Sequence, residues 1–412
     1  MIKFEKFTLD NGLRVIVHED KSTPMAVHDV MYDVGSRDED PDRTGFAHLF
    51  EHLMFGGSIN IPSYDEPLQM AGGENNAYTT NDLTDYHLQL PAENLETAFW
   101  LESDRMISLA FDKNSLDVQK KVVVEEFKEH YINKPYGDAS HKLRELAYKV
   151  HPYKWMTIGK ELSHVENAQL QEVKDFFFKH YTPSNAILTV AGNVTVDRVK
   201  RLAEKWFGEI PPGKKYTRNI PAEPKQDTAR FLKTTGRVPL DALYKCYHMS
   251  SRLDKRYYAA DLVTEILGNG GSSRLFQSLV KERQIFSSIQ CSHWGSADPG
   301  LLYIEGKLVK NITMEQAEEA IAAELKKMKT ALVADKELQK VKNKTESLIA
   351  FEDISLLSRA NSLANYELLG DAGLMNKELL NYQAVTAEDI LEECGNIFLD
   401  TNCTTLHYMS NK

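Results

Sequence analysis

Three residues on one predicted helix have the chemistry and the spacing of a hydrolytic metal site. The helical segment 45–55 contains His48, Glu51 and His52. Histidines at positions i and i+4 project from one face of a helix, a turn apart, which suits two nitrogen ligands of a tetrahedral zinc ion. Glu51 lies near the same face and is placed to accept a proton from a water molecule.

The pattern H-x-x-E-H is the inverted form of the commoner zinc-peptidase signature. Five residues alone are weak evidence, because polar residues on an ordinary amphipathic helix give the same pattern. The neighbouring residues favour a metal, since they make the helix apolar nearly all round: Leu49, Phe50, Leu53, Met54 and Phe55. Histidine and glutamate side chains buried on such a helix need partners, and a metal ion would supply them.

A catalytic zinc site needs a third protein ligand and an open position. Candidates lie in the helical segment 116–130, where the run of three valines at 122–124 is expected to pack inward. Glu125, Glu126 and Glu129 all follow this run. Spacing alone does not choose among the three acids.

The segments around the predicted zinc helix read mainly as strands. They alternate apolar and polar residues or are continuously apolar, and they cover residues 13–18, 26–34, 76–79, 84–90 and 186–192. A further helix is predicted over 95–109. The zinc helix is therefore expected to lie against a sheet.

The chain also shows an internal duplication. Segment 211–226 contains four prolines and separates two halves as a linker would. The first half has VGSR at 34–37, a helix, and GGS at 56–58; the second has MSSR at 249–252, a helix, and GGS at 270–272. In the second helix Leu262 and Ile266 replace the two histidines, so only one half is expected to bind metal.

We therefore predict an α+β fold of two homologous domains, each an antiparallel sheet with helices packed on one face. Residues 1–215 would form an N-terminal zinc-binding catalytic domain. Residues 216–412 would form a C-terminal homologous domain that lacks zinc ligands. A chain of 412 residues is long enough for two hydrophobic cores.

The order of motifs closely resembles that of the pitrilysin-type, or M16, metallopeptidases, in the short form that includes mitochondrial processing peptidase and bacterial relatives. The resemblance covers most of the chain and is strongest in the first half. Besides the zinc helix, it rests on LDNGL at 9–13, VGSRDE at 34–39, FGGS at 55–58, GGENNAYT at 72–79, ESDRM at 102–106, NKPYG at 133–137 and HPY at 151–153.

This resemblance implies a zinc endopeptidase with one Zn²⁺ per chain and Glu126 as the third ligand. Glu51 would activate the water that attacks the peptide bond. An extended or unfolded peptide would pair with the strand at Asn76, Ala77 and Tyr78 by β-augmentation inside a clamshell chamber.

Two features depart from the family pattern. Many members carry an auxiliary acid two helical turns before the third ligand, where this chain has Gln119. Active members, or their partners, also carry an Arg/Tyr pair that stabilises the oxyanion, but the aligned positions here are Val280 and Ser287. We therefore expect a heterodimer in which a homologous M16-type partner subunit supplies the pair. Arg283 with a more distant tyrosine is the alternative within this chain.

A different class of function is a non-catalytic M16-like scaffold subunit, which the complete set of candidate zinc residues disfavours. A net charge of -11 argues against a nucleic-acid partner. The sequence contains no signal-peptide pattern and no apolar run long enough to span a membrane, so we expect a cytoplasmic protein. Its four cysteines form no C-x-x-C pair and are expected to be reduced thiols.

Overall fold

The computed structural model describes residues 1–214 and 216–411 and divides into two compact units, each discontinuous in sequence. Unit 1 comprises Met1–Phe127, Trp155–Ile220 and Ala350–Lys377, and unit 2 comprises Lys128–Lys154, Pro221–Ile349 and Glu378–Lys412. The predicted boundary between domains 1–215 and 216–412 falls on residue 215, which lies outside the described residues. That division stays a prediction.

Unit 1 is built on a six-stranded sheet in the order β1-β2-β6-β3-β5-β4. The strands are β1 (Glu5–Thr8), β2 (Arg14–Glu19), β3 (Met25–Tyr32), β4 (Glu74–Thr79), β5 (Thr84–Pro91) and β6 (Ala186–Gly192). Gly12, with a φ of 88°, closes the turn between β1 and β2, where few residues other than glycine fit. The β-branched and apolar residues of β2, β3 and β6 are buried because these strands lie in the middle of the sheet.

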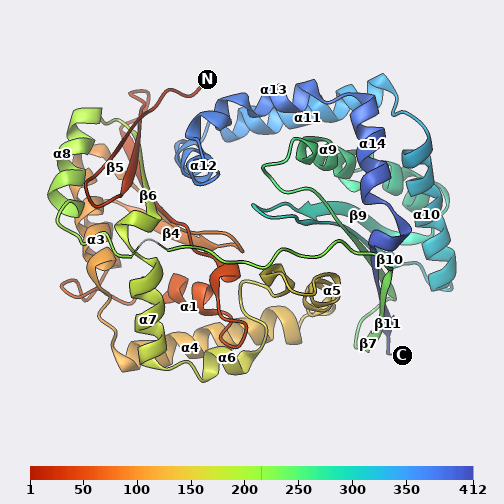
Figure 1. Ribbon diagram of the computed structural model, residues 1–412, viewed down its shortest axis with the longest axis horizontal. Coiled ribbons are helices and arrows are strands. Elements are labelled where there is room, and N and C mark those ends of the chain that lie inside the picture. Colours follow the sequence, from red (N-terminus) through yellow and green to blue (C-terminus); the bar gives the residue numbers. More distant parts are fainter. Residues whose placement is uncertain (215, 412) are drawn as a thin grey trace. The chain divides into compact units, whose positions relative to one another are not determined.

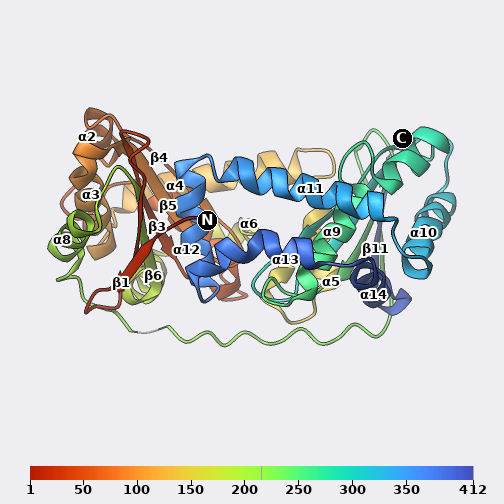
Figure 2. The same ribbon diagram turned by 90° about the horizontal axis from the view of Figure 1, so that it is seen from above.

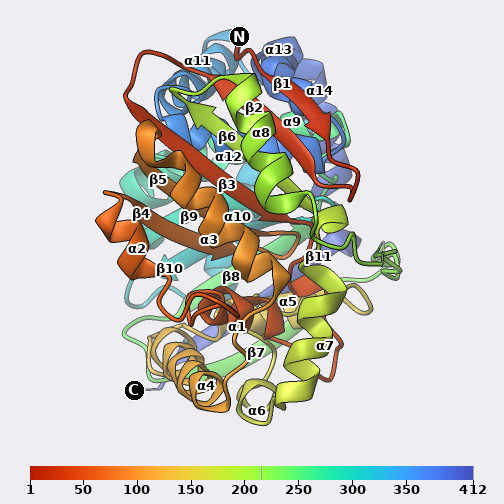
Figure 3. The same ribbon diagram turned by 90° about the vertical axis from the view of Figure 1, so that its left-hand side faces the viewer.

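Helices cover both faces of this sheet. Successive residues of a strand point to opposite sides, so neighbouring residues of β3 contact different helices. On one face His28 of β3 contacts Phe99 and Phe207, which belong to α3 and α8. On the other face Met31 of β3 packs in one cluster with Leu363 of α12. Figure 3 shows α3 and α8 across the near face, and Figure 1 shows α12 on the opposite side. The helices of unit 1 are α1 (Phe46–Leu53), α2 (Asp65–Met70), α3 (Leu95–Ile107), α4 (Lys113–Phe127), α6 (Leu162–Glu166), α7 (Leu170–His180), α8 (Val196–Phe207) and α12 (Leu356–Leu368).

Unit 2 contains a five-stranded sheet in the order β7-β11-β8-β10-β9. Its strands are β7 (Arg230–Gly236), β8 (Ala242–His248), β9 (Phe286–Trp294), β10 (Leu301–Leu308) and β11 (Cys403–Ser410). Its helices are α5 (Ala139–Ala147), α9 (Arg256–Gly268), α10 (Met314–Thr330), α11 (Asp335–Glu352), α13 (Glu378–Ala384) and α14 (Ala387–Ile397). Residues 208–214 and 216–229, between α8 and β7, form no helix or strand (Figure 2).

The two sheets have the same topology. β2, β6, β3, β5 and β4 correspond in order to β7, β11, β8, β10 and β9. In each sheet the first of these pairs is parallel and the other three are antiparallel. The helix α1 follows β3 in unit 1, and the helix α9 follows the corresponding strand β8 in unit 2. This agreement supports the internal duplication.

Each unit contains one helix that comes from the opposite half of the sequence. α5 comes from the first half, yet its residues Ala139 and Leu143 pack with Tyr244, Cys246 and Leu406 of the second sheet. α12 comes from the second half and packs on β3 and β6 of the first sheet.

The α+β class and the two-sheet organisation are confirmed. In detail, the sheets are mixed, because β2–β6 and β7–β11 are parallel pairs. The prediction of helices on one face is wrong, since α5 and α12 cover the second faces. Among the described residues, no helix is long and apolar enough to cross a membrane. Cys246, Cys291, Cys394 and Cys403 are all free thiols.

Candidate active site

The start of α1, the helix that contains His48, Glu51 and His52, is fixed by a buried glutamate. Gly45 precedes the helix with a φ of 89°, and a β-carbon there would lie 2.7 Å from the carbonyl oxygen of Ile158. The Glu39 carboxyl group accepts hydrogen bonds from the backbone N–H groups of Gly45 (3.0 Å) and Ala47 (2.9 Å). It satisfies donors that the first turn of any helix leaves unpaired. Burial raises the pKa of Glu39 to about 8.

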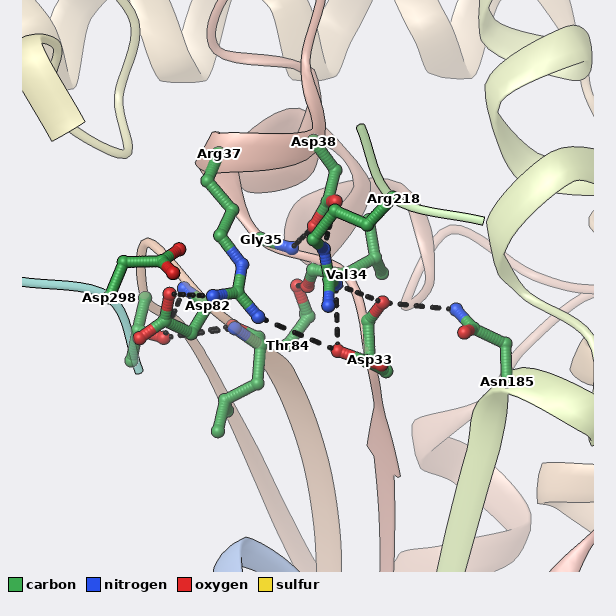
Figure 4. Close-up of polar contacts among 12 residues, drawn as sticks. Asp33, Val34, Gly35, Arg37, Asp38, Asp82, Thr84, Asn185, Arg218 and Asp298 are labelled. Carbon is green, nitrogen blue, oxygen red and sulfur yellow. Dashed lines mark hydrogen bonds and ion pairs between the residues drawn. The ribbon is translucent and has the colours of Figure 1, made fainter. Parts of the chain in front are cut away.

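Residues 34–39 are held by ion pairs on both sides (Figure 4). Arg37 Nη1 lies 2.9 Å from Asp82 Oδ1. Arg218 donates to Asp33 Oδ1 (2.7 Å) and to Asp38 Oδ1 (2.7 Å). Gly35 is required here for a different reason, because a β-carbon would lie 2.4 Å from the carbonyl oxygen of Asn81. The VGSRDE motif is therefore a support for α1.

The ESDRM motif supports the other end of α1. Arg105 is fully buried and its guanidinium Nη2 lies 2.6 Å from Glu102 Oε1. It also stacks over the ring of Tyr86, 4.5 Å from the centroid. Asp104 accepts from the side chain of Asn60 (2.7 Å) and from the hydroxyl of Ser58, which fixes the loop that follows α1.

His48, His52 and Glu126 converge, as the spacing of the histidines requires. The imidazole rings of His48 and His52 are 4.9 Å apart. Glu126 Oε2 lies 3.7 Å from Nε2 of His48 and 3.5 Å from Nε2 of His52. One donor atom from each residue lies within 4.8 Å of the others. Burial lowers the pKa of His48, which keeps its imidazole in the neutral form that binds metals.

The structure places Glu126, and neither neighbouring acid, in this cluster. Glu125 and Glu129 are exposed. Val123 and Val124 are buried, while Val122 is exposed, so two of the three valines pack inward. The α-helical hydrogen bonding ends at Phe127, and residues Lys128–Ile132 continue as a π-helix.

Glu51 is held by Thr79, a residue that was not among the predicted site residues. The hydroxyl of Thr79 donates to Glu51 Oε2 at 2.6 Å. Thr79 is the last residue of β4 and ends the GGENNAYT motif. Side chains alternate along a strand, so Thr79 lies on the same face as Ala77. Its place in the motif could therefore have indicated that Thr79 belongs to the site.

The three predicted substrate-binding residues lie on β4, which is paired only with β5 among the described strands and so forms an edge of its sheet. Tyr78 points away from the metal cluster, since its hydroxyl donates to Asn361 of α12 (2.8 Å). By the same alternation Asn76 shares the face of Tyr78. Its Oδ1 accepts from the N–H of Ala77 (2.9 Å). The backbone of Ala77, rather than the Tyr78 ring, is thus close to the cluster face.

Comparison with known proteins identifies the family. Residues 14–160 match the family described as "Insulinase (Peptidase family M16)", and residues 167–345 match "Peptidase M16 inactive domain". The zinc protease PqqE of Helicobacter pylori is 30% identical over 98% of this chain and 92% of that protein. The chain belongs to peptidase family M16.

Two further relatives agree with the M16 assignment. A crystal structure of a protease from Helicobacter pylori is 29% identical, has a TM-score of 0.92, and covers 99% of this chain and 100% of that chain. The mitochondrial-processing peptidase subunit beta of Saccharomyces cerevisiae is 28% identical over 49% of this chain and 44% of that protein. The resemblance to M16 peptidases drawn from the motifs is confirmed.

The described residues of unit 2 contain no counterpart of the His48–His52–Glu126 cluster, and the positions expected to carry the Arg/Tyr pair are Val280 and Ser287. Val280 packs partly buried against the core of unit 2, and the hydroxyl of Ser287 donates to the carbonyl of Lys307 (3.0 Å). Arg283 is exposed in the turn before β9. Gln119 is half-buried on α4, where an auxiliary acid would stand.

The counterpart of the metal site in unit 2 holds a fixed positive charge. Leu262 and Ile266 of α9 stand where α1 has His48 and His52, and both are fully buried. Glu265 of α9 corresponds to Glu51, and Lys344 Nζ lies 2.5 Å from its Oε2. A lysine ammonium therefore lies beside this glutamate in unit 2, whereas His48, His52 and Glu126 lie beside Glu51 in unit 1.

Proposed function

We propose that this chain is a zinc-dependent endopeptidase subunit that cleaves extended peptides. One observation carries the proposal: His48, His52 and Glu126 converge from two helices beside Glu51, which the edge strand β4 holds in place through Thr79. The names of its M16 relatives as zinc proteases support the same activity.

The donor set fits zinc. Two imidazole nitrogens and one carboxylate oxygen are the ligands of a His₂Glu catalytic site, which leaves a position open. The side chains are 11%, 24% and 34% exposed for His48, His52 and Glu126, so the cluster is open on one side. When bound, zinc would polarise the scissile carbonyl and make a water molecule more acidic.

The residues of the chain would then perform the proton transfers and the positioning. Glu51 would take a proton from the attacking water and pass it to the leaving amine. Thr79 would keep the Glu51 carboxylate in the orientation that this transfer needs. The free edge of β4 would pair with the backbone of an extended peptide beside Ala77, which favours unfolded substrates.

We also propose that the active enzyme is a heterodimer with a homologous M16-type subunit. Neither Val280 nor Ser287 provides a cationic or phenolic hydrogen-bond donor, so a partner would supply the Arg/Tyr pair that stabilises the oxyanion. This chain would contribute the zinc ligands and Glu51.

The test is hydrolysis of a quenched fluorescent peptide library by the purified chain, alone and mixed with a candidate M16 partner, together with the zinc content of each sample. We expect about one zinc per chain and activity only in the mixture. Glu51→Gln should abolish activity and leave the zinc content unchanged, because Glu51 is not a ligand.

Each alternative outcome has a defined meaning. Strong activity of the chain alone, at protein concentrations where it is monomeric, would contradict the heterodimer and favour a donor such as Arg283. A chain that binds no zinc even when zinc is added in excess would overturn the peptidase proposal and favour the scaffold function.

A further inference from the structure

The duplicated fold reveals an open site on unit 2. Each strand of the first sheet except β1 has a counterpart in the second. In unit 1 the chain continues from β6 into α8, which packs against α3 and β2. In the described part of unit 2, no helix takes the corresponding place between β7 and α10.

Residues of β7 in unit 2 are exposed at positions where their counterparts on β2 in unit 1 are buried. Val15 of β2 pairs with Leu188, and Phe231 of β7 pairs with Thr405 at the matching position of the parallel ladder. Val15 lies beneath α8 and is 0% exposed, whereas Phe231 is 57% exposed. Lys233 and Thr235, which follow on the same face of β7, are exposed as well.

A groove lies between β7 and α10, and it is lined by β7, β8, β11, α10 and the end of α14. Its apolar lining includes Phe231, Tyr247, Ile321, Leu325 and Phe398. Charged side chains also line the groove, among them Glu319, Lys329 and the ion pair of Lys245 with Glu318, whose Nζ and Oε2 lie 2.9 Å apart. Apolar side chains flanked by charged ones form the kind of surface that an amphipathic helix covers.

The helix α8 shows which occupant fits such a surface. Its buried residues are Val199, Leu202, Ala203 and Phe207, at i, i+3, i+4 and i+8, and they form one narrow stripe. On the flank of this stripe Lys205 Nζ lies 2.6 Å from Glu96 Oε1 of α3. In unit 2 α10 stands in the place of α3 and presents Glu319 to the groove.

We propose that the groove between β7 and α10 binds an amphipathic α-helix from a partner protein, with an apolar stripe like that of α8 and a basic residue on its flank. The stripe would cover Phe231 and the apolar lining, and the basic residue would pair with Glu319 as Lys205 pairs with Glu96. This proposal is independent of the peptidase activity, because the groove and the zinc residues lie in different units.

Cys403 provides a reporter inside the groove. It is half-buried and lines the groove, with its thiol 3.8 Å from Lys245 Nζ. The other three cysteines are buried. Reaction of the full chain with Ellman's reagent should therefore report mainly on Cys403, and Cys403→Ser should remove the signal.

The experiment measures this reaction with a synthetic peptide of residues 194–209 as the probe. We expect saturable loss of most Cys403 reactivity. A control peptide with Val199→Ser, Leu202→Ser and Phe207→Ser should give no protection. Phe231→Ser in the protein should weaken protection by the α8 peptide, whereas Phe351→Ser, at an exposed position in unit 1, should leave it unchanged.

A second measurement covers the case of weak binding in solution. A copy of residues 193–210 appended after residue 412 acts at high effective concentration, and it should protect Cys403 and raise the Tm relative to the triple-serine version. If neither the peptide nor the appended segment protects Cys403, the proposal is overturned. Protection that rises with protein concentration alone, together with dimer formation, would also overturn it, because a second copy would then occupy the groove.

Discussion

At the scale of single residues, the carboxylates of α4 can be told apart by zinc binding. Glu126 lies at the histidine pair, while Glu125 is its exposed neighbour on the same helix. We expect Glu126→Gln to weaken zinc binding by more than about 100-fold, since even the loss of an outer partner of a ligand costs about 10–100-fold. Glu125→Gln should bind zinc normally. Metal analysis after gel filtration measures both, and equal zinc contents would exclude Glu126 as a ligand.

Thr79 can be tested as a positioning residue for Glu51. Thr79→Val removes a hydrogen bond to a carboxylate, an interaction worth about 1.5–3 kcal/mol, and we expect kcat to fall by about 10–100-fold with little change in KM or zinc content. Thr79→Ser retains the hydroxyl group and should restore most of kcat. Equal rates for the valine and serine variants would show that this hydroxyl does not matter.

Some of these site residues could be predicted from the sequence and others could not. The helical spacing was enough to bring His48 and His52 together, because i and i+4 share a face. It could not choose Glu126 over Glu125, because the orientation of α4 depends on packing against α1, a tertiary contact. Thr79 was missed because a threonine that ends a strand is ordinarily a structural residue.

At the scale of secondary-structure elements, β3 and β5 carry two buried acids beneath α12. Burial and the neighbouring Asp85 raise the pKa of Asp29, and burial raises the pKa of Asp85 to about 7. An acid with a raised pKa contributes stability that is present below its usual value, here 3.8, and is lost as the pH rises through the folded-state value. The free energy of unfolding of unit 1 should therefore decrease between about pH 4 and pH 7.

Asp29→Asn tests this pH dependence. The variant should be more stable than the parent at pH 8 and similar to it at pH 4, because an asparagine has no proton to lose as the pH rises. Asp20→Asn is the matched control, because hydrogen bonds from Ser22 and Arg359 lower the pKa of Asp20. That variant should lose stability at pH 8. Urea unfolding at the two pH values distinguishes the variants, and a pH-independent effect of Asp29→Asn would contradict the prediction.

The segment that leaves α8 is attached to unit 1 by Arg218. Its guanidinium group bridges Asp33 and the fully buried side chain of Asp38. We expect Arg218→Ala to lower the free energy of unfolding by about 2–3 kcal/mol, because it leaves a buried carboxylate without its cation. The loss should be below that of a fully buried pair, since Arg218 is 23% exposed. Arg201→Ala, at an exposed position of α8, should have little effect in the same urea titration.

The strands were predictable and their partners were not. Alternating or continuous apolar residues located β2 to β6 within two residues of their observed ends. The parallel pairing of β2 with β6 joins residues far apart in the sequence, and no local pattern encodes it. The packing of α5 and α12 on distant sheets was missed for the same reason.

At the scale of the whole molecule, the duplication predicts a single zinc per chain. Unit 2 repeats the sheet topology of unit 1, but Leu262 and Ile266 stand where the histidines would be, and Lys344 pairs with Glu265, the counterpart of Glu51. Native mass spectrometry should therefore find one zinc per 46.9 kDa chain at moderate excess of zinc. A second ion that survives Glu126→Gln would contradict this reading of unit 2.

The helix α12 also constrains the order of events during synthesis. The face of the first sheet that contains Ile16, Met31 and Ile187 is covered by Leu363 and Ala364, which leave the ribosome long after the strands they protect. A nascent chain released at the middle of the sequence would expose this apolar face to water. Unit 1 can thus finish folding only when most of the chain has been translated, so premature termination should yield an aggregating fragment rather than a small independent domain.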